Sequence, residues 1–274
     1  MMTALRSLVQ HGDSSPELPR IPELEDLYNF RGGVRFRQGM VGMIVGRSGA
    51  GKSAFALWLC RKWNARTLYL SGDMSPFTVS TRLASMSLRA TTAEVEAMFK
   101  GSDIARAAVL EALEGVRINL SFASPITWRG IDEELFAYVE LWNRYPDVMV
   151  VDNAMDIENC HSDYTEQMAA MQELTALARA TGMTILILHH ATDKGTQAAM
   201  DPFSPPSRNE VKGGLSEKPE LTLSVALNPV GNAFRVAPIK QRDGYSDPSG
   251  KNYVTLQARP EWTTYERYDP RAKL

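Results

Sequence analysis

Eight consecutive residues at 46–53, GRSGAGKS, have the spacing G-x-x-x-x-G-K-[ST] of a loop that binds phosphate groups. Glycines let the backbone wrap around the phosphates, and the N-terminus of a following helix adds a partial positive charge. We expect Lys52 to reach the β- and γ-phosphates of ATP and the Ser53 hydroxyl to bind Mg²⁺, with Mn²⁺ as an alternative metal. The predicted ATP-binding residues are Gly46, Arg47, Ser48, Gly49, Ala50, Gly51, Lys52, Ser53 and Ala54.

Carboxylates follow two strand-like segments. A carboxylate that holds the hydrated Mg²⁺ is expected at the end of a strand next to the strand before the phosphate loop, and DVMVVD ends in this way with Asp152. Asp73 follows the segment LYLSG, and we expect it to activate the attacking water. An N-cap for the next helix is the other interpretation of Asp73, and Asp156 or Glu158 is the reserve candidate for the base.

Two histidines end the segment ILILHH at 185–190. We expect His190 to hydrogen-bond the γ-phosphate or the attacking water and to report its loss to the following loop. A capping or packing role is the alternative for His190. His189 is expected to point to the other side, because successive side chains of a strand alternate.

A pair of cations lies further along, in IKQRDG at 239–244. Residues i and i+2 of a strand face the same way, so Lys240 and Arg242 are expected to present two positive charges to one point. This pair predicts an anion contact, and a solvated strand end is the alternative.

The segments between these residues alternate between strand and helix patterns. Short apolar runs typical of buried strands are MVGMIV, RTLYLS, VRINLSF, DVMVVD and MTILILHH, and helix patterns cover SAFALWLCRKW, 76 to about 114, 130–143 and 165–181. This alternation predicts an α/β fold, with a central, mostly parallel sheet flanked by helices. After about residue 219, ELTLSVAL, AFRVAPIK and NYVTLQA follow one another without a helix and predict a C-terminal antiparallel extension.

The bulk composition is that of a globular protein. The chain has 274 residues, of which 44% are hydrophobic, and a net charge of −2, so any contact with nucleic acid must come from a local patch. Two cysteines and the absence of a long apolar run predict a cytoplasmic protein without a membrane partner. Residues 1–38 form a predicted N-terminal arm, either a frayed terminus or an oligomerisation segment, with Leu5, Leu8 and Val9 as its apolar residues, and 39–274 form the predicted ATPase domain.

The order of these motifs resembles the RecA-type ATPase core of the DnaB-like ring helicase family, in a small form typical of bacteriophages. The resemblance covers about residues 30–258 and rests on FRQGMVGMIVGRSGAGKSAFAL, TLYLSGDMSPFTVSTRLAS, VMVVDN, ILILHHATD, VKGGLSEKPELTLSVAL and IKQRDG. It implies a RecA-like P-loop NTPase fold and a Mg-ATP-dependent motor that binds single-stranded or forked DNA as a hexameric ring, in DNA replication or recombination. It also implies that Lys240 and Arg242 act in trans, on the γ-phosphate held by the next subunit.

The chain departs from the family pattern at three places. Asp73 stands where the family has Glu, which predicts slow hydrolysis, and His190 stands where it has Gln. The family's N-terminal domain and linker have no counterpart in this sequence. The loops at 153–164 and 191–214 are expected to face the channel, with Lys194, Arg208 and Lys212 as nucleic-acid contacts and Gly213 and Gly214 as hinges. Ordinary loop composition is the alternative for these cations.

Two other classes of function fit the same sequence. A metal-dependent, structure-specific DNA nuclease would use acidic and histidine side chains to hold Mg²⁺ or Mn²⁺, and its predicted site comprises Asp152, Asp156, Glu158, His161 and Asp163. A RecA-like recombinase or a regulatory ATPase is the third class. Filaments on DNA would favour the recombinase, and ATPase activity that is indifferent to DNA would favour the regulator.

Overall fold

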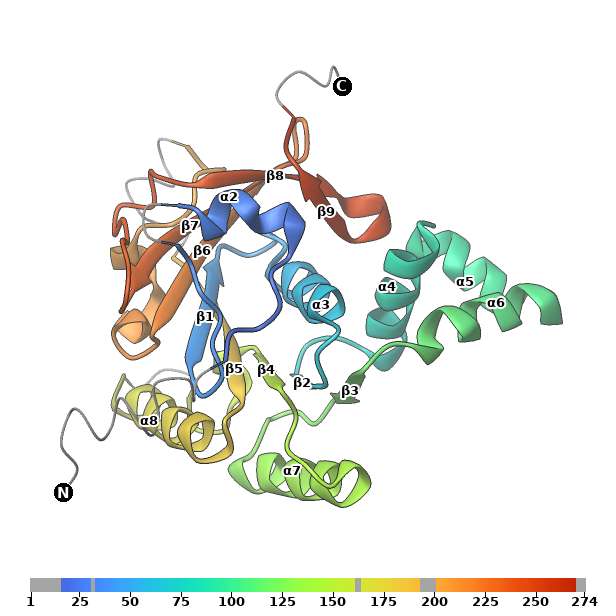
Figure 1. Cartoon of the computed structure of the whole chain (residues 1–274), viewed down its shortest axis with the longest axis horizontal. Coiled ribbons are helices and arrows are strands. Elements are labelled where there is room, and N and C mark those ends of the chain that lie inside the picture. Colours follow the sequence, from blue (N-terminus) through green and yellow to red (C-terminus); the bar gives the residue numbers. More distant parts are fainter. Residues whose placement is uncertain (1–15, 31–32, 161–163, 193–200, 270–274) are drawn as a thin grey trace.

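A single mixed sheet organises the chain in the computed structural model, which describes residues 16–30, 33–160, 164–192 and 201–269. The strand order is β3-β2-β4-β5-β1-β6-β7-β8-β9 (Figure 1). The strands are β1 Val41–Gly46, β2 Thr67–Ser71, β3 Ile118–Ser121, β4 Val148–Asp152, β5 Thr184–His190, β6 Leu221–Asn228, β7 Ala233–Gln241, β8 Val254–Arg259 and β9 Thr264–Arg267. Strands β3 to β6 in this order pair in parallel, and β7, β8 and β9 continue antiparallel. The predicted fold class is confirmed.

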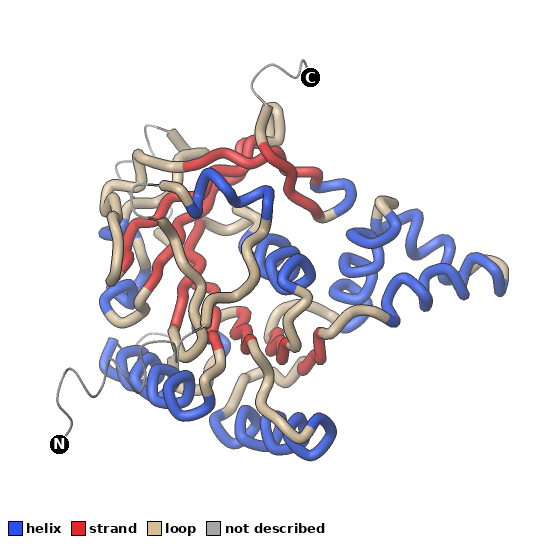
Figure 2. The backbone as a smooth tube through the Cα atoms, in the orientation of Figure 1, coloured by secondary structure: helices blue, strands red, loops and turns tan. Residues whose placement is uncertain are grey.

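Helices cover both faces of the sheet, as Figure 2 shows. The α-helices are α2 Glu25–Tyr28, α3 Lys52–Trp63, α4 Pro76–Leu88, α5 Thr92–Lys100, α6 Asp103–Glu114, α7 Trp128–Trp142 and α8 Tyr164–Thr181. The 3-10 helices are η1 Pro22–Leu24, η2 Ala154–Asp156, η3 Arg208–Glu210, η4 Lys212–Glu217 and η5 Pro260–Trp262. One hydrophobic core lies between the sheet and α3, and a second lies between the sheet and α7 with α8.

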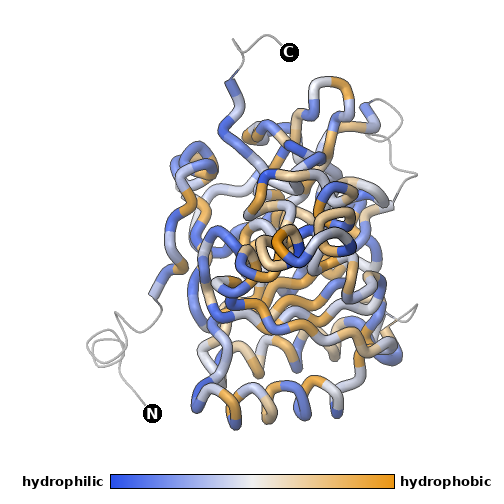
Figure 3. Tube along the Cα trace, turned by 90° about the vertical axis from the view of Figure 1, so that its right-hand side faces the viewer, coloured by the Kyte–Doolittle hydropathy of each residue, from blue (hydrophilic) through white to orange (hydrophobic). Residues whose placement is uncertain are grey.

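The central strands are buried on both faces, which explains their continuous apolar sequences. Every residue of β1, β2 and β4 is buried. Figure 3 shows hydrophobic residues gathered along these strands and hydrophilic residues on the outer helices and loops. The sheet is therefore a rigid support whose strand ends can carry the polar side chains of a site.

The helical region predicted from 76 to about 114 is three helices, α4, α5 and α6. They project from the side of the domain beyond β3 (Figure 1) and share a small core of Ala84, Val95 and Val109. The predicted capping box at the start of α5 is confirmed. The Thr91 hydroxyl accepts from the Glu94 amide at 3.1 Å, and the Glu94 carboxylate accepts from the Thr91 amide at 2.7 Å.

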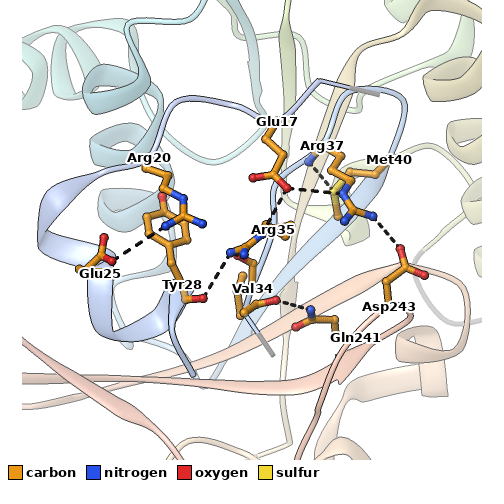
Figure 4. Close-up of polar contacts among 11 residues, drawn as sticks. Glu17, Arg20, Glu25, Tyr28, Val34, Arg35, Arg37, Met40, Gln241 and Asp243 are labelled. Carbon is orange, nitrogen blue, oxygen red and sulfur yellow. Dashed lines mark hydrogen bonds and ion pairs between the residues drawn. The ribbon is translucent and has the colours of Figure 1, made fainter. Parts of the chain in front are cut away.

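The described part of the predicted N-terminal arm packs onto the domain. Leu24 and Leu27 are fully buried in the core that contains α3. In Figure 4 Arg37 reaches Asp243, with Nη1 to Oδ2 at 2.9 Å, and the Gln241 amide donates to the Gly33 carbonyl at 2.6 Å. Leu5, Leu8 and Val9 lie outside the described residues, and the domain boundary at residue 38 stays a prediction.

Three details differ from the expectations. The helix expected at 130–143 begins at Trp128, because the Thr127 hydroxyl caps it by accepting from the Gly130 amide at 2.9 Å. Strand β9 follows the tight turn of η5 and was not expected, since its four residues carry no clear alternation. Within the described residues no helix is both long and apolar enough to span a membrane.

Candidate active site

The phosphate loop joins β1 to α3 at the carboxyl edge of the parallel strands. Gly46 ends β1, and Gly51 precedes the first residue of α3 with a left-handed φ of 82°. A Cβ on Gly46 would lie 2.8 Å from the Val225 carbonyl oxygen, so this position has no room for a side chain. The loop and the N-terminus of α3 thus have the form expected of an anion site.

Lys52 lies at the centre of this loop. Its side chain is buried, and Nζ donates to the carbonyls of Gly46 and Arg47, both at 3.1 Å. The third neighbour is His190 Nδ1 at 3.4 Å. An ammonium group can only donate, so the geometry assigns the lone pair of His190 to Nδ1. Lys52 and His190 therefore meet at one point, as the sequence predicted for two groups that bind one phosphate.

Asp152 ends β4 and is buried beside α3. Its Oδ2 accepts from the Tyr69 hydroxyl at 2.7 Å, and its carboxylate also accepts from the Ser53 hydroxyl. Burial raises the pKa of Asp152, while the hydrogen bonds from Tyr69 and Ser53 and the charge of Lys52 act in the opposite direction. A carboxylate and a hydroxyl in contact are oxygen donors of the kind that Mg²⁺ prefers, so Ser53 and Asp152 fit this ion.

The expected position of the Asp152 strand was wrong in one respect. Strand β5 lies between β4 and β1, so β4 is not the neighbour of the strand that leads into the phosphate loop. The inserted strand brings His190 next to Gly46, its partner in the β1–β5 register. The chain order of the segments could not reveal this, because strand order depends on how the crossovers pack.

Asp73 lies two residues beyond β2, at the same edge of the sheet. It is exposed, and its Oδ2 accepts from Asn153 Nδ2 at 3.1 Å. Asn153 is buried and directly follows Asp152, so it ties the predicted base to the predicted metal ligand. Sequence reasoning missed Asn153, although its place after the strand in VMVVDN is the signal that could have found it.

The two histidines of β5 differ in their environment. His189 is buried, and its Nε2 lies 2.8 Å from the Lys212 carbonyl. Burial lowers the pKa of His189 to about 4, so the ring is neutral near pH 7. His189 therefore contacts the loop that carries Lys212, while His190 faces Lys52, which agrees with the expectation that the two rings point to opposite sides.

Lys240 and Arg242 lie at the other end of the sheet. Leu221 pairs with Gly42 at the start of β1 and with Gln241 at the end of β7. In the isolated chain the Lys240 ammonium donates to the Glu217 carbonyl, and Arg242 Nη1 lies 3.3 Å from Glu220 Oε1. Burial, followed by the charges of Arg208 and Arg242, lowers the pKa of Lys240 to about 8.

Comparison with known proteins identifies the family. Residues 17–196, more than half of the chain, match the family described as AAA domain. The chain belongs to this AAA domain family. The match begins within the segment that packs on the core of α3, and it ends just beyond β5.

Relatives of this AAA domain occur in two bacteriophages. The Gene 65 protein of Mycobacterium phage L5 is 29% identical over 271 residues, which are 94% of this chain and 95% of that protein. The Gene 65 protein of Mycobacterium phage D29 is 29% identical over 226 residues, which are 78% of this chain and 94% of that protein.

Solved structures place the AAA domain in a fold. A protein solved as an isolated ATPase domain superposes with a TM-score of 0.73 at 16% identity, covering 97% of this chain and 98% of that chain. A DnaB-like replicative helicase, solved to study its interactions with primase, gives a TM-score of 0.69 at 15% identity, covering 85% of this chain and 60% of that chain. The fold is that of a RecA-type ATPase core, which confirms the resemblance.

The predicted nucleic-acid contacts of the AAA domain lie near one another where the structure describes them. Lys212 is exposed, and Arg208 is half-buried with Nε 3.4 Å from Ser216 Oγ. Gly213 and Gly214 follow with left-handed φ of 64° and 63°, so the turn depends on residues without a Cβ. Lys194 lies outside the described residues, and the role of all three cations stays a prediction.

The alternative nuclease set is dispersed in part. The Asp156 carboxylate accepts from the Asn153 amide at 2.9 Å, and Glu158 accepts from the Trp128 amide at 2.9 Å. Both carboxylates thus stabilise local turns and helix ends. His161 and Asp163 lie outside the described residues, and no group of three or more potential metal ligands occurs in the part of the chain that the structure describes.

Replacement of Gly46 by alanine tests the close packing of the phosphate loop. The added Cβ would meet the Val225 carbonyl at 2.8 Å, so we expect a loss of about 1–3 kcal/mol in the free energy of unfolding and weaker ATP binding. Chemical denaturation and nucleotide titration measure the two effects. Gly115→Ala is the control, since nothing lies within 4 Å of its added Cβ, and an equal loss there would contradict the explanation.

Proposed function

We propose that this AAA domain is a Mg-ATP-dependent motor ATPase that acts on single-stranded or forked DNA as a ring, a helicase-like translocase in phage DNA replication or recombination in the host cytoplasm. Family membership, the RecA-type fold and the phosphate loop support ATP as the ligand. The names of the similar structures, an ATPase domain and a DnaB-like replicative helicase, support the helicase-like activity. The two Gene 65 relatives support a phage origin.

The position of Lys240 and Arg242 relative to the phosphate loop carries the proposal. Gln241 is level with Gly42, and the loop begins at Gly46. With a rise of about 3.3 Å per residue, the two levels are about 13 Å apart along β1. An arginine side chain does not extend so far, so this pair cannot contact the phosphates of its own subunit. A function for the pair in hydrolysis therefore requires a second copy of the chain.

The groups of one subunit prepare ATP for attack. Lys52 exchanges the carbonyls of its loop for phosphate oxygens, and Ser53 with Asp152 holds Mg²⁺. When bound, Mg²⁺ neutralises charge on the β- and γ-phosphates. Asp73, held by Asn153 at 3.1 Å, orients and deprotonates the attacking water. The shorter aspartate side chain lies further from the phosphate than a glutamate would, which favours slow hydrolysis.

The neighbouring subunit completes the site. Its Arg242 and Lys240 leave their present partners, Glu220 and Glu217, and neutralise the charge that develops on the γ-phosphate. His190, whose Nδ1 faces Lys52, is placed to change partners when the γ-phosphate is lost. Hydrolysis is thereby confined to the assembled ring.

The pKa of Lys240 predicts how activity depends on pH. This pKa is lowered to about 8, so Lys240 is charged below pH 8 and loses its charge as the pH rises through 8. Since kcat/KM reports the groups of the free enzyme, we expect kcat/KM for ATP to fall above pH 8. Lys240→Arg keeps the charge and is expected to abolish this fall. An alkaline limb that is identical in the variant would contradict the role of Lys240.

An end-labelled forked DNA, incubated with the protein, Mg²⁺ and ATP, tests the proposed function. We expect intact displaced strands on native gels and full-length strands on denaturing gels, with no displacement by the Lys52→Ala variant. Shortened strands would indicate the nuclease instead. ATP hydrolysis that DNA does not change, with no displaced strand, would indicate a regulatory ATPase and contradict the motor.

A further inference from the structure

Arg47, inside the phosphate loop, is a buried cation with a buried anionic partner. Arg47 is 9% exposed and Glu210 is 5% exposed, and Nη2 of Arg47 lies 3.1 Å from Oε1 of Glu210. Nη1 donates to the carbonyls of Ser204 at 2.8 Å and Pro202 at 3.3 Å. The side chain of Arg47 therefore binds the segment 201–217 and not the centre of the phosphate loop.

The backbone of the same residue responds to the phosphate site. Lys52 Nζ donates to the Arg47 carbonyl at 3.1 Å, and to the Gly46 carbonyl at the same distance. A phosphate bound in the loop competes with these carbonyls for the donors of Lys52. Arg47 is thus connected to the phosphate through its carbonyl and to the segment 201–217 through its guanidinium.

Glu210 anchors the other end of this connection. Its Oε2 accepts from the Ser207 amide at 2.7 Å and from the Ser207 hydroxyl at 2.8 Å. Its carbonyl accepts from the Thr192 amide at 2.8 Å, next to the bridge between Ala191 and Val211. The cations Arg208 and Lys212, which we expect to contact DNA, are each two residues from Glu210. Movement of the Glu210 carboxylate therefore displaces the backbone between the two cations.

We propose that Arg47 and Glu210 are positioning residues that couple the occupancy of the phosphate loop to the conformation of segment 201–217. This inference rests on the proposed function for the ligand of that segment, single-stranded DNA. The physical reason is the cost of a buried charge without its partner, which forces the two residues to move together. Nε of Arg47 is buried without a hydrogen-bond partner among the described residues, so a second arrangement could satisfy it better.

Another arginine provides a matched control. Arg235 also binds this segment, with Nη1 3.0 Å from Asp201 Oδ2 and 3.1 Å from the Phe203 carbonyl. It belongs to β7, outside the phosphate loop, so its backbone does not follow the partners of Lys52. Arg235→Ala should therefore loosen the segment without affecting its response to nucleotide. The links from β5, through His189 and Ala191, stay intact in all variants.

Hydrogen–deuterium exchange of segment 201–217, with and without saturating ATPγS, tests the coupling. We expect ATPγS to change the exchange rates in the natural protein, and the change to shrink at least about threefold in Glu210→Gln and in Arg47→Lys, within the usual range of about 5- to 150-fold for such couplings. Arg235→Ala should exchange faster in both states but keep the natural ratio. Thermal melting checks that each variant is folded.

Two results would overturn the coupling: a nucleotide response in Glu210→Gln equal to that of the natural protein, or no response in the natural protein. A purely structural pair would give the first, since exchange would then rise in both states by one factor. Fluorescence anisotropy with a labelled oligo-dT strand separates this inference from the proposed function. If the exchange pattern is as expected but no protein binds the strand, the coupling stands and the proposed ligand is wrong.

Discussion

Arg242→Ala is expected to lower kcat for ATP hydrolysis by about 10³- to 10⁵-fold, the usual effect of losing a trans arginine. The affinity of the same subunit for ATP should stay unchanged, because Arg242 lies at the end of the sheet away from its own phosphate loop. Steady-state hydrolysis and the binding of a fluorescent ATP analogue measure the two quantities separately.

Arg179→Ala is the matched control for this variant. Arg179 lies on α8, is exposed, and reaches the same carboxylate, with Nη2 4.0 Å from Glu220 Oε1. Its removal changes the charge near Glu220 without touching the end of β7, so hydrolysis should stay near the natural rate. Equal losses in both variants would mean that the local charge matters and that Arg242 has no special role.

Asp152→Asn is expected to lower kcat by at least about 10²- to 10³-fold, comparable to removing one preorganised electrostatic group. Asparagine keeps the shape and can still accept from the Tyr69 hydroxyl, so the fold should persist. It lacks the negative charge next to Ser53 that holds Mg²⁺. We therefore also expect a higher Mg²⁺ concentration for half-maximal activity, measured by titration at saturating ATP.

Asp156→Asn distinguishes the ATPase site from the alternative nuclease site. The Asp156 carboxylate accepts the Asn153 amide, a bond that an asparagine oxygen can retain. We expect this variant to keep most of its ATPase activity and its Mg²⁺ dependence. A loss as large as that of Asp152→Asn would contradict the assignment of Asp152 as the metal ligand and would favour a shared acidic cluster.

The residues of the phosphate site were predictable because each stands in a local pattern. The loop at 46–53, Asp152 after an apolar strand and His190 after another are recognisable within a few residues of sequence. Parallel strands then bring their carboxyl ends to one edge, as the contact of Lys52 with His190 at 3.4 Å illustrates. Lys240 and Arg242 were recognisable as a pair, but their place at the opposite end of β1 depends on the register of β6 and β7.

Contacts that depend on packing across the chain were not predictable. Arg47 and Glu210 are 163 residues apart, and neither has a spacing that indicates a buried ion pair. Insertion of β5 between β4 and β1 follows from how the helices cover the sheet. The segment 16–38 carries Pro, Gly and charge and so resembles a loose arm, yet Leu24 and Leu27 are fully buried. Its apolar residues are few, but all face one core.

The most direct test of ATP hydrolysis between subunits is a mixture of Lys52→Ala and Arg242→Ala proteins. Each variant alone should be inactive, one without the phosphate-binding lysine and the other without the finger. If the finger acts in trans, random assembly of equal amounts gives about one complete site in four, and ATPase activity should recover in proportion. If no mixing ratio restores activity while the two variants co-assemble, hydrolysis does not use Arg242 of a neighbour, and the proposed ring mechanism is wrong.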